Sequence, residues 1–205
     1  MLHQIQSYFK FLRESTNEHG VHSPFVFNLV TKCFYDNKKH PEYSILKNYR
    51  DALLQNRDTI EVTDFGAGSK VFKSNTREIS KIAKTAGITQ NRAALLFRIV
   101  KYFKPESILE IGTSVGLATA ALSAGNPSSQ ITTLEGCPET SKTAQLQFKN
   151  FGLENIHAIV SEFETFLENR QPTTDNRQPT YQLIYFDGNH QKQATLQYFD
   201  LLLST

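Results

Sequence analysis

Apolar positions in the second half of the chain alternate between short continuous runs and helix-spaced stripes. The run at 107–111 is of strand type, ends in a glycine-bearing turn, and gives way at 117–122 to an Ala/Leu pattern with helical spacing. Three more short runs follow, each leading into a helical pattern: 130–134, 155–160 and 181–186. Alternating strands and helices predict a parallel sheet covered by helices. We therefore expect an α/β fold with a Rossmann-like parallel sheet of about four strands.

The first half of the chain shows mostly helical spacing. Apolar residues recur every three or four positions in 2–14, 25–34 and 42–56, and Ser23-Pro24 suits the start of the second of these helices. Residues 76–104 contain two further helical stretches with Gly87 between them. We expect residues 1–104 to form a helical cap or extension and residues 105–205 to form the Rossmann-like domain. The first three helices would form either a cap or a surface for homo-oligomer formation.

The helical pair within 76–104 also resembles a helix-turn-helix unit. An ordinary pair of helices is favoured, because 91–103 carries mostly Ala, Leu, Phe and Ile where a recognition helix presents basic or amide side chains. A formal net charge of only +2 points the same way. We expect no nucleic-acid partner.

Composition sets further limits. Among 205 residues, 15 Phe argue for a folded core. Cys33 and Cys137 are too few and too far apart for a disulfide framework, so we expect buried free thiols and a cytoplasmic location. No stretch approaches the ~18 apolar residues of a spanning helix, and the N-terminus lacks the apolar core of a signal peptide. We expect no membrane partner.

Candidate binding chemistry gathers where the strands end, because ligands of parallel α/β sheets bind outside the carboxyl ends of the strands. The turn after the first strand contains Gly112, Thr113, Ser114 and Gly116. Its glycines would let a ligand approach the backbone, and its outward N–H groups would hold a nucleotide-like or carboxylate-bearing ligand. Glu135 ends the next strand, 23 residues after Gly112, near the distance at which an acid accepts bonds from ribose hydroxyls.

Four other residues lie at or beside strand ends. Glu110 would either meet an amine or backbone donors of the ligand or brace the turn. Glu162 would accept from an adenine amino group or begin a helix. Asp187 would bind a divalent cation such as Mg²⁺ or orient a nucleophile, with His190 as general base. Alternatively, Asp187-Gly188-Asn189 is simply a turn.

Two segments are expected to be connecting loops. Residues 60–69 run from a strand-like pattern into Gly66-Ala67-Gly68, but polar residues follow and no acid-ended strand comes ~20 residues later, so a structured connector is favoured over a ligand loop. The sequence Asn-Arg-Gln-Pro-Thr occurs at 169–173 and again at 176–180, which is typical of an enlarged, flexible surface loop.

Residues 105–203 resemble the first half of a class I S-adenosylmethionine-dependent methyltransferase. The run Ile108-Leu109-Glu110-Ile111-Gly112-Thr113-Ser114-Val115-Gly116 is similar to the cofactor motif of the O-methyltransferase-type branch, in which Glu-Ile-Gly-Thr is characteristic. Asp187-Gly188-Asn189-His190 is similar to its later Asp-Gly-Asx-His motif. The resemblance implies a methyltransferase that uses S-adenosylmethionine, with Mg²⁺ or another divalent cation as a second candidate cofactor.

The resemblance also implies roles for single residues. Gly112 and its neighbours would face the methionine portion of the cofactor, Glu135 would hold the ribose, and Glu162 would lie near the adenine. Asp187 would border the methyl acceptor or a metal. Ser114 departs from the family pattern, since it stands at the middle glycine of Gly-x-Gly-x-Gly.

A second departure concerns length, because the family's sheet normally has seven strands and only four are found before Thr205. We therefore expect a chain truncated after the fourth strand. The expected function is O-methylation of a small-molecule acceptor. The alternatives are a non-catalytic or truncated S-adenosylmethionine-binding protein and a nicotinamide-binding Rossmann domain, since Glu135 would serve either cofactor.

Overall fold

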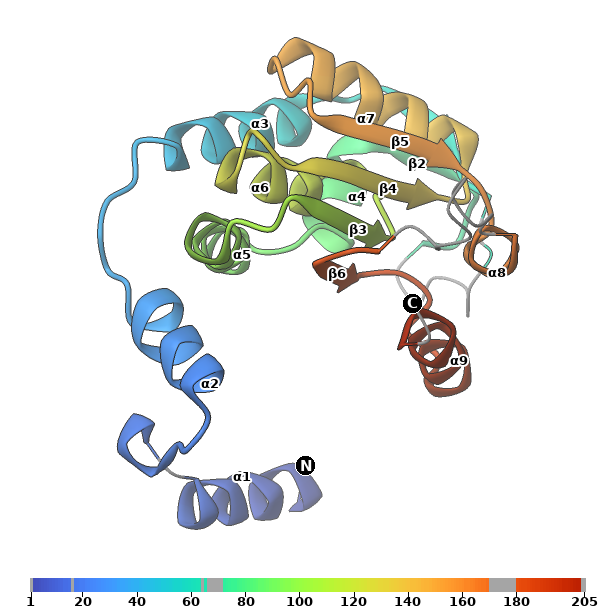
Figure 1. The fold of residues 1–205 in the computed structure, drawn as a ribbon. Coiled ribbons are helices and arrows are strands. Elements are labelled where there is room, and N and C mark those ends of the chain that lie inside the picture. The colour runs from blue at the N-terminus through green and yellow to red at the C-terminus, as the bar shows by residue number, and fades with distance from the viewer. Residues whose placement is uncertain (1, 16, 64, 66–71, 170–179, 204–205) are drawn as a thin grey trace. The chain divides into compact units, whose positions relative to one another are not determined.

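The computed structural model describes residues 2–15, 17–63, 65, 72–169 and 180–203. By contacts the chain divides into two compact units, Met1–Lys38 and Lys39–Thr205. Figure 1 shows the order of the elements along the chain. No helix among the described residues is long and apolar enough to cross a membrane.

The first unit is helical wherever it has regular structure in its described residues. Its elements are α1 (Leu2–Glu14), η1 (Glu18–Gly20), α2 (Pro24–Asn28) and the π-helical turn η2 (Leu29–Phe34). Ser23 caps α2 as predicted, because its hydroxyl accepts a hydrogen bond from the Val26 N–H. Within these described helices Cys33 is the one buried residue, so their apolar side chains lie largely at the surface.

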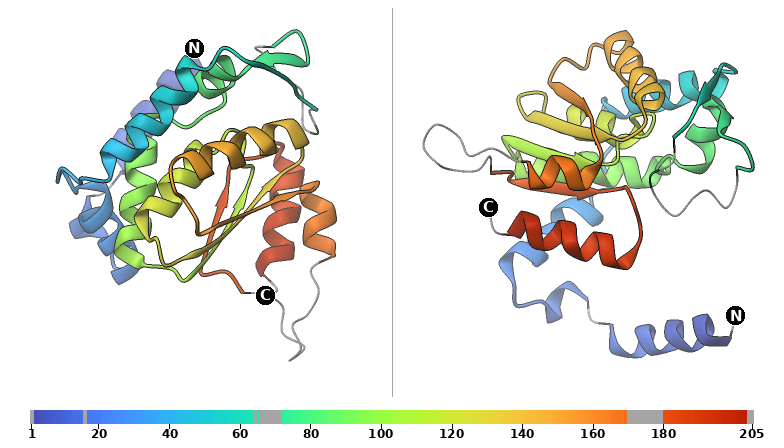
Figure 2. Two further views of the ribbon diagram at one scale, coloured as in Figure 1. Left: turned by 90° about the horizontal axis from the view of Figure 1, so that it is seen from above. Right: turned by 90° about the vertical axis from the view of Figure 1, so that its right-hand side faces the viewer.

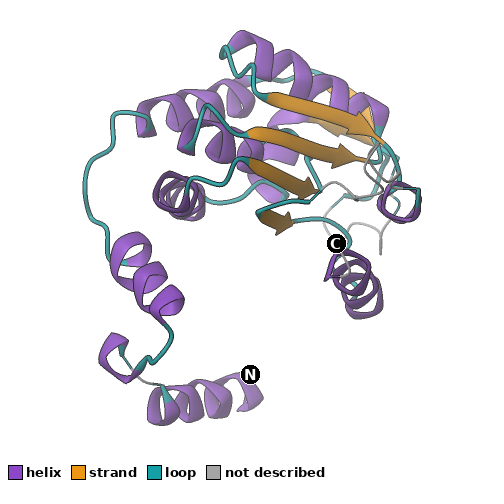
Figure 3. Cartoon of the chain, in the orientation of Figure 1, coloured by secondary structure: helices purple, strands orange, loops and turns teal. Residues whose placement is uncertain are grey.

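The second unit is built on a four-stranded parallel sheet with the order β5-β4-β3-β6. Its strands are β3 (Ser107–Ile111), β4 (Gln130–Glu135), β5 (Ile156–Val160) and β6 (Leu183–Phe186). The four arrows point the same way in Figure 3. The predicted α/β fold and its four strands are confirmed. Because β4 and β6 flank β3 on opposite sides, strand order reverses at β3, which is where such sheets bind ligands.

Helices cover both faces of this sheet (Figure 2). The larger core contains side chains from α3 (Tyr43–Gln55), α4 (Ile79–Thr85), α5 (Gln90–Phe103), α6 (Leu117–Gly125) and α7 (Pro138–Asn150). The smaller core lies under α8 (Phe163–Glu168) and α9 (Lys192–Leu203). Alternate residues of β3 serve the two cores, Ile108 the larger and Leu109 the smaller, as the two-residue period of a strand requires.

The division expected between residues 104 and 105 does not coincide with the division by contacts. Tyr49 of α3 and Phe97 and Val100 of α5 are fully buried in the larger core. These helices are therefore part of the α/β unit. The α4–α5 pair packs its apolar face inward, in line with the interpretation of 76–104 as an ordinary helical pair.

Residues 59–78 differ from the expected pattern. A second, two-stranded antiparallel sheet pairs β1 (Thr59–Glu61) with β2 (Thr76–Glu78). The helix expected from residue 76 therefore begins at Ile79, because Thr76-Arg77-Glu78 pairs with a distant segment that local periodicity does not reveal. Gly66–Gly68 of the expected connector, and all but Asn169 and Thr180 of the repeated pentapeptides, lie outside the described residues.

Candidate functional site

A cavity of about 310 Å³ lies at the carboxyl ends of all four parallel strands. Gly112 and Ser114 line it after β3, Glu135 at the end of β4, Glu162 after β5 and Asp187 after β6. Five of the predicted site residues are thus brought together at one edge of the sheet. The volume falls within the ~300–1,000 Å³ of small-molecule sites.

Glu135 connects the end of β4 to the turn after β3. Its Oε2 accepts a hydrogen bond from the Ser114 N–H at 2.8 Å, and its Oε1 accepts one from the Cys137 N–H at 3.0 Å. Burial raises the pKa of Glu135, and these backbone N–H groups partly oppose that rise. The carboxylate therefore borders the cavity in a fixed orientation, with acceptor capacity left for a ligand.

Gly112 is required by the approach of β6 to β3. Its φ is +106°, and a Cβ at this position would lie 2.7 Å from the Asp187 backbone. The Asp187 N–H donates to the Ile111 carbonyl at 2.8 Å. The missing side chain thus lets Asp187 approach β3 at the edge of the cavity, a reason for this glycine other than the expected approach of a ligand.

Gly116 lies on the side of the turn away from the cavity lining. Its φ is +81°, and a Cβ there would collide with the Tyr49 hydroxyl and the Phe148 ring. Packing against these two side chains thus accounts for the glycine, and the approach of a ligand to Gly116 stays a prediction. Protein side chains occupy that space.

The N–H groups of the turn differ from their predicted role. Those of Gly112 and Thr113 both donate to the Leu134 carbonyl, at 3.0 and 2.9 Å, and that of Gly116 donates to the Thr113 carbonyl at 2.9 Å. The Ser114 N–H donates to Glu135. These four groups do not point outward to a ligand, because the turn closes on β4 and on itself.

Glu110 and Thr113 lie beneath the turn and do not line the cavity. Glu110 is fully buried, and its Oε2 accepts hydrogen bonds from the hydroxyls of Thr119 and Thr133. Thr113 Oγ1 lies 2.6 Å from Thr133 Oγ1. Burial raises the pKa of Glu110 to about 8, although the two hydroxyls act in the opposite direction. Glu110 thus links β3 to β4 and α6 through these two hydrogen bonds.

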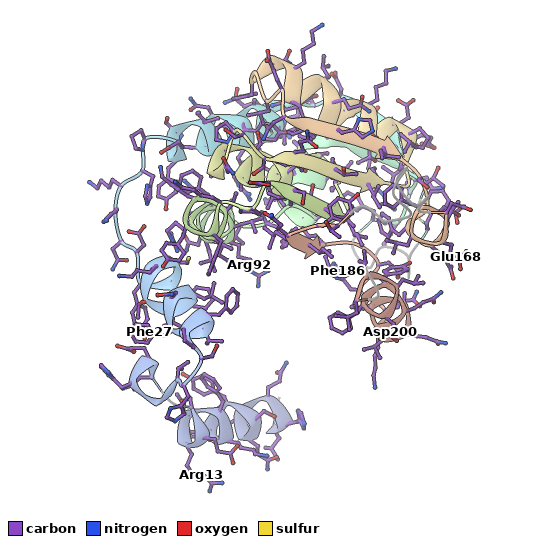
Figure 4. All side chains as sticks on the ribbon, viewed as in Figure 1. Arg13, Phe27, Arg92, Glu168, Phe186 and Asp200 are labelled. Atoms are coloured by element: carbon purple, nitrogen blue, oxygen red, sulfur yellow. The ribbon has the colours of Figure 1, made fainter. Side chains whose placement is uncertain are left out.

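Asp187 is half-buried and faces several polar groups. Burial raises the pKa of its carboxyl, and the electrostatic effects of His190 and Arg92 and a hydrogen bond from the Tyr185 hydroxyl oppose the rise. Figure 4 labels Arg92 on α5 and Phe186, which directly precedes Asp187. His190 is exposed and lies outside the cavity lining.

Asn189 supplies a polar group that the sequence analysis did not single out. Its Nδ2 donates to the Tyr198 hydroxyl at 3.1 Å, and its Oδ1 is buried with no hydrogen-bond partner in the part of the chain that the structure describes. Both residues line the cavity. A buried acceptor without a partner is costly unless a ligand or water satisfies it.

Several other lining residues were also missed. Phe163 and Tyr198 pack edge to face, with ring centroids 6.1 Å apart, and give one wall an aromatic surface. Phe65, from the expected connector, and Arg77, from the start of the expected helical stretch 76–104, also line the cavity. Phe163 could have been found from its position next to Glu162. No local signal marks Phe65 and Arg77, because only tertiary packing brings their segment to the cavity.

Few side chains at the cavity could coordinate a metal ion. Among the described residues no group of three or more His, Cys, Asp or Glu side chains is placed to hold a metal ion. The Asp187 carboxylate and the Asn189 amide oxygen are hard oxygen donors that line the same cavity.

Comparison with protein families gives one match, in which residues 109–205 correspond to a family model described as a methyltransferase domain. A comparison with curated proteins finds no match.

Solved structures similar to the chain include three methyltransferases. The SAH-bound methyltransferase PaMTH1 of Podospora anserina is 17% identical with a TM-score of 0.59, and the match covers 93% of this chain and 67% of that one. TomG from Streptomyces achromogenes, an O-methyltransferase in complex with SAM, is 16% identical with a TM-score of 0.54. An O-methyltransferase from Bacillus cereus in complex with SAH is 17% identical with a TM-score of 0.52.

For TomG and the B. cereus protein the match covers 85% of this chain and 65% of the other. The chain therefore spans about two thirds of the length of the three proteins. At these identities the likeness shows a shared fold.

Proposed function

We propose that this chain, whose residues 109–205 match a family model described as a methyltransferase domain, binds S-adenosylmethionine and transfers its methyl group to an oxygen of a small molecule. The observation that carries the proposal is the cavity at the ends of β3, β4, β5 and β6, with Glu135 at its β4 border. The neighbours crystallised with SAH or SAM support the choice of cofactor.

The donors and acceptors around the cavity suit this cofactor. Glu135 would accept hydrogen bonds from the two ribose hydroxyls, as acids at this position of dinucleotide-binding folds do. Glu162 would accept from the adenine amino group, and Phe163 offers an aromatic surface for the base. The turn at Gly112 and Ser114 would face the methionine portion. When bound, the cofactor supplies a methyl group on a positively charged sulfur.

The protein's part in the chemistry would be orientation and proton transfer. The cavity would hold the acceptor oxygen in line with the methyl group. Such positioning lowers the activation free energy of methyl transfer, because the two reacting groups are already oriented. Asp187 would take the proton of the acceptor hydroxyl, and burial makes its carboxylate a stronger base than an exposed aspartate. His190, three residues further on, would relay the proton outward.

As an alternative to direct proton transfer to Asp187, we propose that a divalent cation binds at the same site. Asp187 and Asn189 offer two oxygen donors, and Mg²⁺ commonly retains several waters beside one or two protein ligands. A cation there would lower the pKa of the acceptor hydroxyl. Turnover that is unchanged by EDTA would remove the cation from the proposal.

Calorimetric titration with S-adenosylhomocysteine tests the site. We expect micromolar affinity for the parent chain and at least tenfold weaker binding for Glu135→Ala. Glu139→Ala is the matched control, because Glu139 is an exposed acid in the first turn of α7, and it should bind like the parent. Absence of binding to a chain shown to be folded would sink the proposal.

The other interpretations give different results in related assays. A non-catalytic binding protein would bind S-adenosylhomocysteine but transfer no methyl group to any of a panel of small hydroxyl compounds. A nicotinamide-binding domain would bind NADH in preference to S-adenosylhomocysteine. Either result would replace the proposed transferase activity.

We further propose a cytoplasmic location, a homo-oligomeric state and no nucleic-acid partner. Free Cys33 and Cys137, both buried, support a reducing compartment. On α5, Arg98 donates to the Tyr43 hydroxyl and Lys101 pairs with Glu42, so these basic side chains are engaged within the protein and do not form a row for phosphates.

A further inference from the structure

The turn between β3 and α6 is contacted from both sides. On the cavity side Glu135 accepts the Ser114 N–H. On the opposite side Tyr49 of α3, far away in the sequence, donates its hydroxyl to the Val115 carbonyl at 3.0 Å. Ser114 itself has a φ of +48°, a conformation that a residue with a side chain adopts only when its surroundings impose it.

We propose that Tyr49 is a positioning residue for the cofactor site, because its hydroxyl fixes the backbone of the turn at 112–116. This inference deepens the proposed function and rests on it where ligand binding is concerned. Tyr49 touches neither the cavity nor any group of the proposed reaction. It acts through Val115 and Gly116.

The hydrogen bond has no substitute nearby. Val115 is fully buried, and in the described part of the chain no other donor reaches its carbonyl oxygen. Without the Tyr49 hydroxyl this buried carbonyl would lose its hydrogen-bond donor. Because a buried acceptor without a donor is costly, the backbone of the turn would then favour rotations that bring the carbonyl to another donor. Burial keeps the phenol protonated by raising the pKa of Tyr49, so it stays a donor.

The tyrosine ring is itself held firmly. It stacks on Phe148 with ring centroids 6.3 Å apart and an interplanar angle of 25°, and it packs against Phe151 at 5.1 Å. The space where a side chain at residue 116 would begin is filled by the Tyr49 hydroxyl and the Phe148 ring. Gly116 and Tyr49 therefore interlock, and helix α3 sets the position of the turn.

Tyr49→Phe tests the inference, since it keeps the ring in the core and removes only the hydroxyl. The matched control is Tyr43→Phe on the same helix, where the lost hydroxyl accepts from Arg98 and has no contact with the turn. Hydrogen–deuterium exchange of a peptide covering 112–118 is measured in the ligand-free chain. We expect faster exchange in Tyr49→Phe and parent-like exchange in Tyr43→Phe. Equal exchange in all three proteins overturns the proposal, whether or not the chain binds the cofactor.

Binding to two ligands provides the functional measurement. S-adenosylhomocysteine contains the amino-acid end that the turn would face, whereas 5′-methylthioadenosine lacks it. We expect Tyr49→Phe to bind S-adenosylhomocysteine about three- to tenfold more weakly, the range for one lost hydrogen bond, and to bind 5′-methylthioadenosine like the parent. An equal loss for both ligands would indicate a general effect on the fold and overturn the positioning role. If the parent binds neither, the proposed function fails, and the exchange measurement still decides whether Tyr49 holds the turn.

Discussion

Gly112 and Gly152 both have positive φ, of +106° and +64°, but only one has neighbours at its Cβ position. A Cβ on Gly112 would lie 2.7 Å from the Asp187 backbone, while one on Gly152 would meet nothing within 4 Å. We expect Gly152→Ala to cost only the ~1–2 kcal/mol of the left-handed conformation. Gly112→Ala should cost clearly more, because β3 and β6 must separate. Urea unfolding of both variants measures the difference, and equal losses would contradict the role assigned to Gly112.

Glu110 should make stability depend on pH in an unusual direction. Its pKa is about 8 in the folded chain, above the ordinary 4.5, so the folded state keeps the proton that the unfolded state releases between these values. Stability from this group is therefore fully present below about pH 4.5 and is lost as the pH rises to about 8. Each pKa unit corresponds to ~1.4 kcal/mol, so the loss amounts to several kcal/mol.

Glu110→Gln tests this assignment, because an amide oxygen still accepts from Thr119 and Thr133 but carries no ionisable proton. Urea unfolding at pH 5, 7 and 9 should show a flatter pH profile for this variant than for the parent. Glu106→Gln, which changes an exposed acid four residues earlier, should keep the profile of the parent. An unaltered profile in Glu110→Gln would show that this carboxyl does not titrate in the expected range.

The position of a residue at a strand end was predictable, but its orientation was not. Glu135, Glu162 and Asp187 line the cavity as their places after apolar runs indicated. Glu110 and Gly116 belong to the same motif and face the protein interior instead. Whether a residue of the motif faces the cavity or the protein interior depends on how α3, α6 and α7 pack behind the turn. This packing cannot be predicted from the local sequence.

Helix α9 gives the smaller core much of its cover, together with α8. Leu202 is 5% exposed and packs in that core, whereas the adjacent Leu203 is 65% exposed. We expect Leu202→Ala to destabilise the chain by about 2–5 kcal/mol and Leu203→Ala to change stability by no more than ~0.5 kcal/mol. Thermal and urea unfolding check this pair. Similar effects of the two substitutions would mean that α9 does not dock as described.

Among the elements, those with strong periodicity were predicted and the short irregular ones were not. All four parallel strands and the helices after them follow from runs of apolar residues and their spacing. The β1–β2 sheet has strands of only three residues, each largely polar and exposed or half-buried, so it carries no pattern. The contribution of Phe65 and Arg77 to the cavity lining could therefore not be predicted from the sequence and is seen only in the structure.

For the chain as a whole, the sequence indicated the α/β class correctly but placed the division in a different position. Helices α3 to α5 were expected to form a cap, since they precede the sheet in the sequence. Their buried residues lie in the larger core, and the division by contacts falls between Lys38 and Lys39. In this chain α3, α4 and α5 pack on the sheet although they precede its first strand in the sequence.

The segment before that division carries an apolar surface that lacks cover within its own unit. Leu2, Ile5, Phe9 and Leu12 recur on one face of α1, and each is at least half exposed. A helix of 13 residues is only marginally stable in water on its own, so burial of this face would stabilise it. We propose that this face packs against the same face of a second copy of the chain, because identical faces on two chains can bury one another about a two-fold axis.

Light scattering coupled to size exclusion tests this assembly. We expect the parent chain to have at least twice its 23.3 kDa mass. The double variant Ile5→Ser/Phe9→Ser should shift to the monomer mass, because polar side chains in the centre of the face remove the gain from burial. His3→Ser/Gln6→Ser, on the polar side of the same helix, should keep the parent's mass. A monomeric parent at micromolar concentration would mean that the face is covered within one chain and would exclude the proposed homo-oligomer.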